Sequence, residues 1–170
     1  MNISRRALLR TGGYAVAGGF LGAGMLGLGA RATAATPAKG FEVTHTDAEW
    51  RALLSPAQYN VLRKAGTEYP YSSPLNKEHR RGKFACAGCA LPLFVSATKF
   101  ESGTGWPSFW APIANAVIER SDSSLGMRRT EVACRRCGGH LGHVFNDGPR
   151  PTGKRYCMNG AAMTFAPDPA

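Results

Sequence analysis

Five cysteines are the side chains best suited to chemistry in this chain of 170 residues. Four of them form two C-x-x-C pairs and the fifth stands alone near the C-terminus, in the order Cys86 and Cys89, Cys134 and Cys137, Cys157. Two C-x-x-C pairs separated by 44 residues are typical of a tetrahedral metal site. The count therefore predicts one metal centre and one thiol that is left free for reaction.

The unpaired cysteine lies in a segment with polar side chains at alternate positions, Arg155, Cys157 and Asn159. Residues two apart on a strand point to the same face, so the pattern predicts that all three project into one pocket. Tyr156 and Met158 would then face the core. The guanidinium of Arg155 would stabilise a thiolate. Many unpaired cysteines are small buried core residues, and this segment alone leaves that interpretation open.

The four paired cysteines predict a structural zinc ion. Gly88, Gly138 and Gly139 lie where a zinc knuckle turns backbone N–H groups toward sulfur. Four thiolates fill every position around a tetrahedral Zn²⁺, so we expect one structural zinc per chain, held by Cys86, Cys89, Cys134 and Cys137. The alternative is two local disulfides or a redox pair, although a disulfide within C-x-x-C closes a small, strained ring.

Two of the four histidines, His140 and His143, follow the second cysteine pair directly. Histidine can act as a general acid near neutral pH. A glycine-rich turn within residues 100–110 presents aromatic side chains upstream. The combination favours a catalytic pocket, while a purely structural role for either histidine remains the alternative at this point.

The first 34 residues have the composition of an export signal. Arg5 and Arg6 precede an uncharged run at residues 11–30 with eight glycines, and a small-residue cleavage pattern ends at Ala34. The paired arginines resemble a twin-arginine signal, an address read by the twin-arginine translocase. We expect cleavage after Ala34 and a periplasmic or otherwise exported protein. An uncleaved membrane anchor is the alternative, because about 20 apolar residues can span a bilayer.

The charge balance does not favour a nucleic-acid partner. The chain holds 21 Lys plus Arg against 11 Asp plus Glu, and removing residues 1–34 leaves 17 against 11. This mild excess is scattered in pairs, which is typical of a solvated surface. Nothing in the sequence suggests a coiled coil or a large apolar face, so we expect a monomer.

The rest of the chain predicts a short linker at residues 35–44 and one domain at 45–170. Thr46 and Glu49 form a capping box, and Ser55-Pro56 begins a second short helix that would end at Gly66. The remainder reads as an antiparallel β-rich body. The predicted strands are residues 83–86, 93–95, 116–120, 127–132, 143–145, 155–158 and 162–165, with a hairpin loop at 121–126.

Taken in order, these motifs resemble the peptide methionine-(R)-sulfoxide reductases, the B-type family. The likeness runs from Thr67-Glu68-Tyr69-Pro70 through both cysteine pairs, Ser102-Gly103-x-Gly105-Trp106-Pro107-Ser108-Phe109 and His140-Leu-Gly-His143-Val-Phe to Arg155-Tyr-Cys157-Met-Asn159. The resemblance implies a mainly β fold with two small antiparallel sheets (β-tent, Mss4-like), short N-terminal helices and a four-cysteine zinc knuckle site. It also implies an oxidoreductase that reduces methionine sulfoxide in oxidised proteins, with free methionine sulfoxide as a further candidate substrate.

The resemblance implies a role for each site residue. The catalytic set is Cys157, His143, His140, Asn159 and Arg155, and the substrate-binding set is Trp106 and Phe145. Cys157 would attack the sulfoxide sulfur and His143 would protonate its oxygen, with His140 and Asn159 orienting that pair and Arg155 holding the thiolate. Trp106, with Phe145, would cradle the ε-methyl group and select the R epimer. The product would be methionine and a sulfenic acid on Cys157.

The sequence departs from the family pattern at Thr104, where many members carry a recycling cysteine. We therefore expect a one-cysteine mechanism in which an external reductant, a thioredoxin-like protein or a small thiol, resolves the sulfenic acid. Two other classes remain as alternatives. One is a zinc-ribbon binding module, and the other is a different enzyme on a related zinc-knuckle β-fold, such as a glutathione-dependent aldehyde-handling protein.

Overall fold

The computed structural model describes residues 40–169, so the predicted export signal and the first half of the predicted linker lie outside it. Within this range no helix has the length and apolar character needed to cross a membrane. The helices are α1 (Asp47–Leu53) and α2 (Pro56–Lys64), with 3₁₀ turns η1 (Pro74–Lys77), η2 (Ser96–Thr98), η3 (Ser124–Gly126) and η4 (Gly160–Ala162). The strands are β1 (Gly82–Cys86), β2 (Pro92–Val95), β3 (Lys99–Phe100), β4 (Ser108–Phe109), β5 (Val117–Asp122), β6 (Arg129–Cys134), β7 (His140–Phe145), β8 (Arg155–Met158) and β9 (Met163–Pro167).

Both helices begin at the predicted capping boxes. The Thr46 hydroxyl accepts a hydrogen bond from the Glu49 backbone N–H, and the Glu49 carboxylate accepts one from the Thr46 N–H at 2.7 Å. Ser55 caps α2 in the same reciprocal way. The end of α2 differs slightly from the prediction, because the left-handed residue is Ala65, with a φ of 53°. Gly66 instead lies close to Asn60, since a Cβ there would lie 2.3 Å from the end of the Asn60 side chain and 3.0 Å from its carbonyl oxygen.

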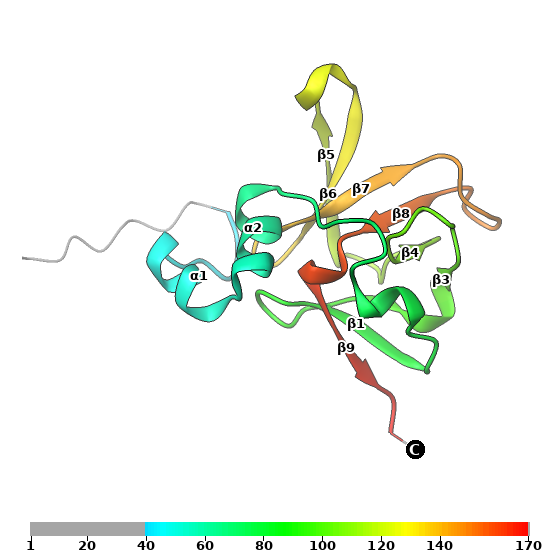
Figure 1. Cartoon of the computed structure of the whole chain (residues 1–170), viewed down its shortest axis with the longest axis horizontal. Helices are drawn as coiled ribbons and strands as arrows, with labels where there is room; N and C mark the ends of the chain where they lie inside the picture. Colours follow the sequence, from blue (N-terminus) through cyan, green and yellow to red (C-terminus); the bar gives the residue numbers. More distant parts are fainter. Residues whose placement is uncertain (1–39, 170) are drawn as a thin grey trace, which may run out of the picture. The chain divides into compact units, whose positions relative to one another are not determined.

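The strands form two antiparallel sheets, as expected for the predicted fold class (Figure 1). The smaller sheet has the order β2-β1-β9 and the larger has the order β3-β4-β8-β7-β6-β5. Strands β3 and β4 were not predicted, because strands of two residues are too short to show an alternating pattern. The predicted start of β7 was His143, whereas the strand begins at His140. The loop between β5 and β6 starts later than predicted, because β5 continues to Asp122.

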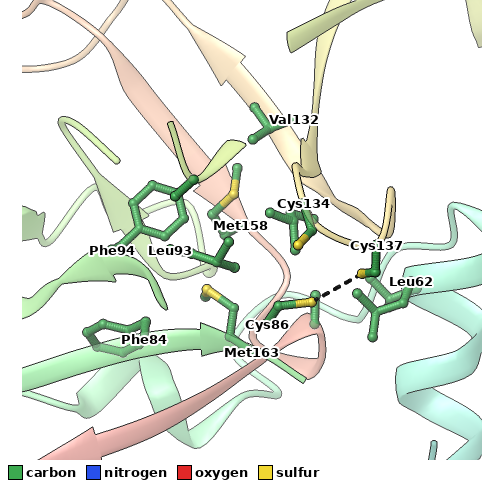
Figure 2. Close-up of a cluster of buried hydrophobic side chains, with 14 of the residues drawn as sticks. Leu62, Phe84, Cys86, Leu93, Phe94, Val132, Cys134, Cys137, Met158 and Met163 are labelled. Atoms are coloured by element: carbon green, nitrogen blue, oxygen red, sulfur yellow. Dashed lines mark hydrogen bonds between the residues drawn. The ribbon is translucent and has the colours of Figure 1, made fainter. Parts of the chain in front are cut away.

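The two sheets contribute to one apolar core. Phe84 of β1 meets Phe109 of β4 with ring centroids 4.9 Å apart, and Phe94 of β2 stacks on Phe109 at 4.3 Å. Tyr156 and Met158 of β8 are buried, as the alternation predicted. In Figure 2, Met158 and Phe94 lie on one side of this cluster, and the cysteines and Leu62 of α2 lie on the other.

The larger sheet has a polar row on one face. Antiparallel pairing places five residues in register across five strands: Arg120 on β5, Glu131 on β6, His143 on β7, Cys157 on β8 and Ser108 on β4. Residues in register on neighbouring antiparallel strands lie side by side on the same face. The fold therefore brings the predicted nucleophile and the predicted acid together as cross-strand neighbours.

Candidate functional site

The four paired cysteines come together at the ends of two strands. Cys86 ends β1 and Cys134 ends β6, while Cys89 and Cys137 lie in the turns that follow. All four sulfur atoms lie within 4.8 Å of one another. The Sγ atoms of Cys86 and Cys137 are 3.7 Å apart (Figure 2), and those of Cys89 and Cys134 are 3.5 Å apart.

These distances fit a tetrahedral metal site. A metal ion with four bonds to sulfur of about 2.3 Å sets its sulfur atoms about 3.8 Å apart. The two close contacts join different C-x-x-C pairs, and all four thiols are free. This geometry argues against the local disulfides that the sequence left as an alternative. Gly138 allows the second turn, because it has a φ of 68° and a Cβ there would lie 2.4 Å from the Phe41 ring.

Cys157 lies half-buried in the middle of β8, outside this cluster. Its Sγ is 3.9 Å from the Thr104 hydroxyl, which in turn lies 2.9 Å from the Ser102 hydroxyl. Burial raises the pKa of the Cys157 thiol above its ordinary value, while the Thr104 hydroxyl and the positive charge of Arg155 act in the opposite direction. The thiolate is therefore formed less readily than the neighbouring arginine alone would suggest.

Arg155 is shared between two partners besides the thiol. Its Nε and Nη2 donate to the two carboxylate oxygens of Asp147 at 2.9 and 2.8 Å. Its guanidinium also lies 4.4 Å from the centroid of the Phe145 ring. The structure thus gives Phe145 a contact that the sequence did not predict, because one face of this ring is covered by Arg155. Asp147 was also missed, although it follows the His140–Phe145 strand by two residues.

The two histidines are held by different carboxylates. His140 is buried, and its Nδ1 lies 2.9 Å from Glu131 Oε1. Burial lowers the pKa of His140, and the contact with Glu131 opposes that shift. His140 Nε2 is buried without a hydrogen bond to any described residue, which suits a neutral ring with its proton on Nδ1. The His140 and His143 rings meet edge to face, with centroids 5.3 Å apart.

His143 contacts a carboxylate from β5, one of the two edge strands of the larger sheet. Its Nε2 lies 2.8 Å from Asp122 Oδ2, and Arg129 Nη2 donates to the same carboxylate oxygen at 2.8 Å. Neither Asp122 nor Glu131 was predicted as a site residue from the sequence. The available signal was the alternation of charge at Arg120 and Asp122 and again at Arg129 and Glu131, which places charges on one face of each strand.

The sequence predicted that Asn159 projects into the pocket beside Cys157, and the structure shows a different position. The strand ends at Met158, and the Asn159 side chain is only 4% exposed. Its Oδ1 accepts from the Glu68 backbone N–H at 3.0 Å, and its Nδ2 donates to the Leu141 carbonyl at 3.0 Å. Asn159 therefore anchors the loop that carries Glu68. Any effect of Asn159 on the pocket passes through that loop.

Trp106 is held by the same loop. Its Nε1 donates to the Glu68 carbonyl at 3.2 Å, and the next residue, Pro107, accepts from the Met158 backbone N–H at 3.0 Å. Tyr71 adds two bonds to the turn, because its N–H donates to the Gly105 carbonyl and its hydroxyl to the Gly103 carbonyl, both at 2.7 Å. The indole is thus anchored beside β8, the strand that carries Cys157.

The site joins a half-buried thiol, a neighbouring imidazole and a held indole on a two-sheet β-domain with a four-cysteine cluster. This arrangement defines a thiol-based enzyme. Comparison with known proteins agrees, since a SelR domain profile matches residues 54–167. The chain is also 52% identical over 126 residues to a peptide methionine sulfoxide reductase MsrB of Leptospira interrogans, a match that covers 74% of this chain and 96% of the relative.

Further relatives carry the same description. An MsrB of Agrobacterium fabrum is 53% identical over 127 residues, covering 74% of this chain and 94% of the relative. An MsrB of Pseudomonas putida (strain GB-1) is 57% identical over 120 residues, covering 70% and 92%. The chain therefore belongs to the MsrB family of methionine sulfoxide reductases and is an oxidoreductase.

Proposed function

We propose that this enzyme reduces the R epimer of methionine sulfoxide in polypeptides through attack by Cys157. The observation that carries the proposal is the position of Cys157, half-buried on the polar sheet face with His143 as its cross-strand neighbour. The thiolate bonds to the sulfoxide sulfur while His143 gives a proton to the sulfoxide oxygen. The oxygen then passes to Cys157, so that the methionine sulfur gains two electrons and Cys157 loses two, leaving methionine and a sulfenic acid.

Epimer selection is the direct test of this proposal. Trp106 would cradle the ε-methyl group and so fix which face of the sulfoxide meets Cys157. The experiment is an assay driven by dithiothreitol on peptides that carry each sulfoxide epimer separately. We expect turnover of the R epimer only, and activity confined to the S epimer would contradict the assignment.

We propose further that Cys157 is recycled by an external thiol. Thr104 stands 3.9 Å from Cys157, at the position where many relatives carry a second cysteine. The other four cysteines are gathered in the cluster. One external thiol would displace water from the sulfenic acid to give a mixed disulfide, and a second thiol would release Cys157 and leave as a disulfide. A thioredoxin-like protein or a small thiol can supply both.

Mass spectrometry after one turnover without reductant tests this route. We expect one added oxygen on Cys157 in the wild-type protein. Thr104→Cys is the matched control, because a thiol at that position is placed to form a disulfide with Cys157. An intramolecular disulfide in the wild-type protein would contradict the one-cysteine mechanism.

A polypeptide substrate is supported by the exposed aromatic side chains beside the site. Tyr69 and Tyr71 are 85% and 70% exposed, and the loop that carries them is bonded to the turn that carries Trp106. Exposed aromatic residues at the rim of a site are suited to contacting the chain on either side of the oxidised methionine. We expect Tyr69→Ser to weaken turnover of an oxidised peptide several-fold and to leave turnover of free methionine sulfoxide unchanged. Equal loss on both substrates would contradict this role.

We propose that the four-cysteine cluster binds one structural Zn²⁺ per chain. The support is the set of sulfur–sulfur distances and the use of all four coordination positions by protein thiolates. Bound zinc would supply folding free energy by joining the turn after β1 to the turn after β6. Metal analysis tests this, and well under one zinc per chain together with four titratable thiols would contradict it.

We also propose export through the twin-arginine pathway, with cleavage after Ala34, and a monomeric mature enzyme. The support for export is the Arg5-Arg6 signal, which lies outside the described residues. A folded, metal-loaded domain suits this route, because its thiols would be protected before they reach an oxidising compartment. Replacing both arginines by lysine should retain the protein in the cytoplasm, and light scattering on the mature protein tests the monomer.

A further inference from the structure

We propose that Asp122 is a positioning residue that sets which ring nitrogen of His143 faces the reacting atoms. This inference rests on the proposed role of His143 as the acid. Asp122 ends β5, the outermost strand of the larger sheet, and is three strands away from Cys157 on β8. Its carboxylate nevertheless reaches His143 Nε2 at 2.8 Å.

The direction of this carboxylate is set by its own hydrogen bonds. Asp122 Oδ1 accepts from the Ser124 backbone N–H at 2.8 Å, and Oδ2 accepts from Arg129 Nη2 at 2.8 Å. These contacts, with the Ser124 bonds as the largest cause and the His143 bond next, hold the pKa of Asp122 well below its usual range. The group is therefore an ionised acceptor with a fixed orientation, and not a freely rotating side chain.

The strand register alone would predict a different carboxylate as the hydrogen-bond partner of His143. Glu131 lies directly opposite His143 in the β6–β7 pair. Its carboxylate, however, is turned toward His140 at 2.9 Å and Arg120 at 3.3 Å. Glu131 thus contacts the histidine diagonal to it on β7, while Asp122 reaches from β5 to a histidine two strands away. The charged and titratable groups around His143 are Asp122, Glu131, Arg129, His140 and Cys157, and among the described residues only Asp122 bonds to its ring.

This pairing has a chemical consequence. An ionised carboxylate only accepts hydrogen bonds, so His143 Nε2 must carry a proton to bond to Asp122. Nδ1 is then the nitrogen that gains and releases the proton in the reaction. The doubly protonated ring is the form that can protonate the sulfoxide oxygen, and it does so through Nδ1. When Nδ1 gives up its proton, the neutral ring is left with its remaining proton on Nε2, and Nδ1 takes up a proton from solvent before the next cycle.

The test compares Asp122→Asn with Asp122→Glu in single-turnover formation of the sulfenic acid, using a peptide that carries the R epimer. The measured quantities are the rate, its dependence on substrate concentration, and the rate of Cys157 alkylation. We expect the Asn variant to react about 100-fold more slowly, with unchanged half-saturation and alkylation, and the Glu variant to recover part of the rate. The matched control is Glu119→Gln, which removes one negative charge from the same strand at a side chain bonded to Tyr156.

A spectroscopic measurement on the wild-type protein tests the same proposal without any variant, and so does not depend on whether a variant folds. Histidine ring ¹H–¹⁵N correlations identify which nitrogen of His143 carries the proton in the neutral ring. We expect Nε2. A resting Nδ1–H tautomer, or an Asn variant that reacts at the wild-type rate, would overturn the role of Asp122. Failure of the wild-type enzyme on the R epimer would instead overturn the proposed function and leave the tautomer measurement unaffected.

Discussion

Two sulfur sites in this domain differ in their surroundings and in the roles proposed for them. The four-cysteine cluster lies in the core, where Cys86 and Cys134 are 1% and 0% exposed. Cys157 is half-buried on a polar sheet face and has Thr104, His143 and Arg155 as neighbours. Four thiols that face one another in the core are suited to sharing one metal ion. A thiol next to an imidazole and a guanidinium can instead react with a molecule from outside.

Removing the proposed zinc ion should have the largest effect, because it would act on the whole fold. Treatment with a strong chelator, or Cys134→Ser, should cost on the order of 10 kcal/mol of folding free energy. Circular dichroism should show loss of the folded signal together with loss of activity. If the domain melts at the same temperature with and without metal, the cluster does not stabilise the fold and this prediction is wrong.

Cys157→Ser should have the opposite signature, a loss of catalysis with the fold intact. We expect activity on the R epimer to fall on the order of 1,000-fold or more, because a serine hydroxyl cannot form the sulfenic acid that carries the oxygen. Zinc content and melting temperature should match the wild-type protein. If this variant unfolds, Cys157 has a structural role like that proposed for the four clustered cysteines.

Arg155→Gln and Asp147→Asn should move the reactivity of Cys157 in opposite directions. The charge of Arg155 lowers the pKa of Cys157 and that of Asp147 raises it. Alkylation requires the thiolate, so its rate rises with pH. The midpoint of that rise should move to higher pH in Arg155→Gln and to lower pH in Asp147→Asn. Iodoacetamide alkylation followed across pH measures both, and shifts of the same sign would contradict this electrostatic account.

Thr104→Val should have the smallest effect. It removes a hydroxyl that lies 3.9 Å from the thiol and opposes the effect of burial on the pKa of Cys157. The alkylation midpoint should move slightly upward in pH, and turnover should fall about twofold, which is the size expected when a weak hydrogen bond is lost. Thr104→Ser, which keeps the hydroxyl, is the matched control and should behave like the wild-type protein in the same alkylation assay.

Local features of the fold were predictable because their causes are local. The capping boxes at Thr46 and Ser55 depend on residues three positions apart, and both are present. The burial of Tyr156 and Met158 follows from strand alternation. The start of β7 was missed because Gly142 looks like a turn residue in the sequence. In the structure a Cβ at Gly142 would lie 2.1 Å from the Cys157 carbonyl, so this glycine lets β7 approach β8.

The number of thiols, their spacing and the motifs that identify the family can all be read from the amino-acid sequence. That Asn159 turns inward to Glu68, and that Asp122 rather than Glu131 bonds to His143, becomes visible only in the folded chain. Spacing along a chain constrains neighbours within a few residues. The partner of a side chain on a sheet depends instead on register, twist and the competing donors from several strands, which no single segment contains.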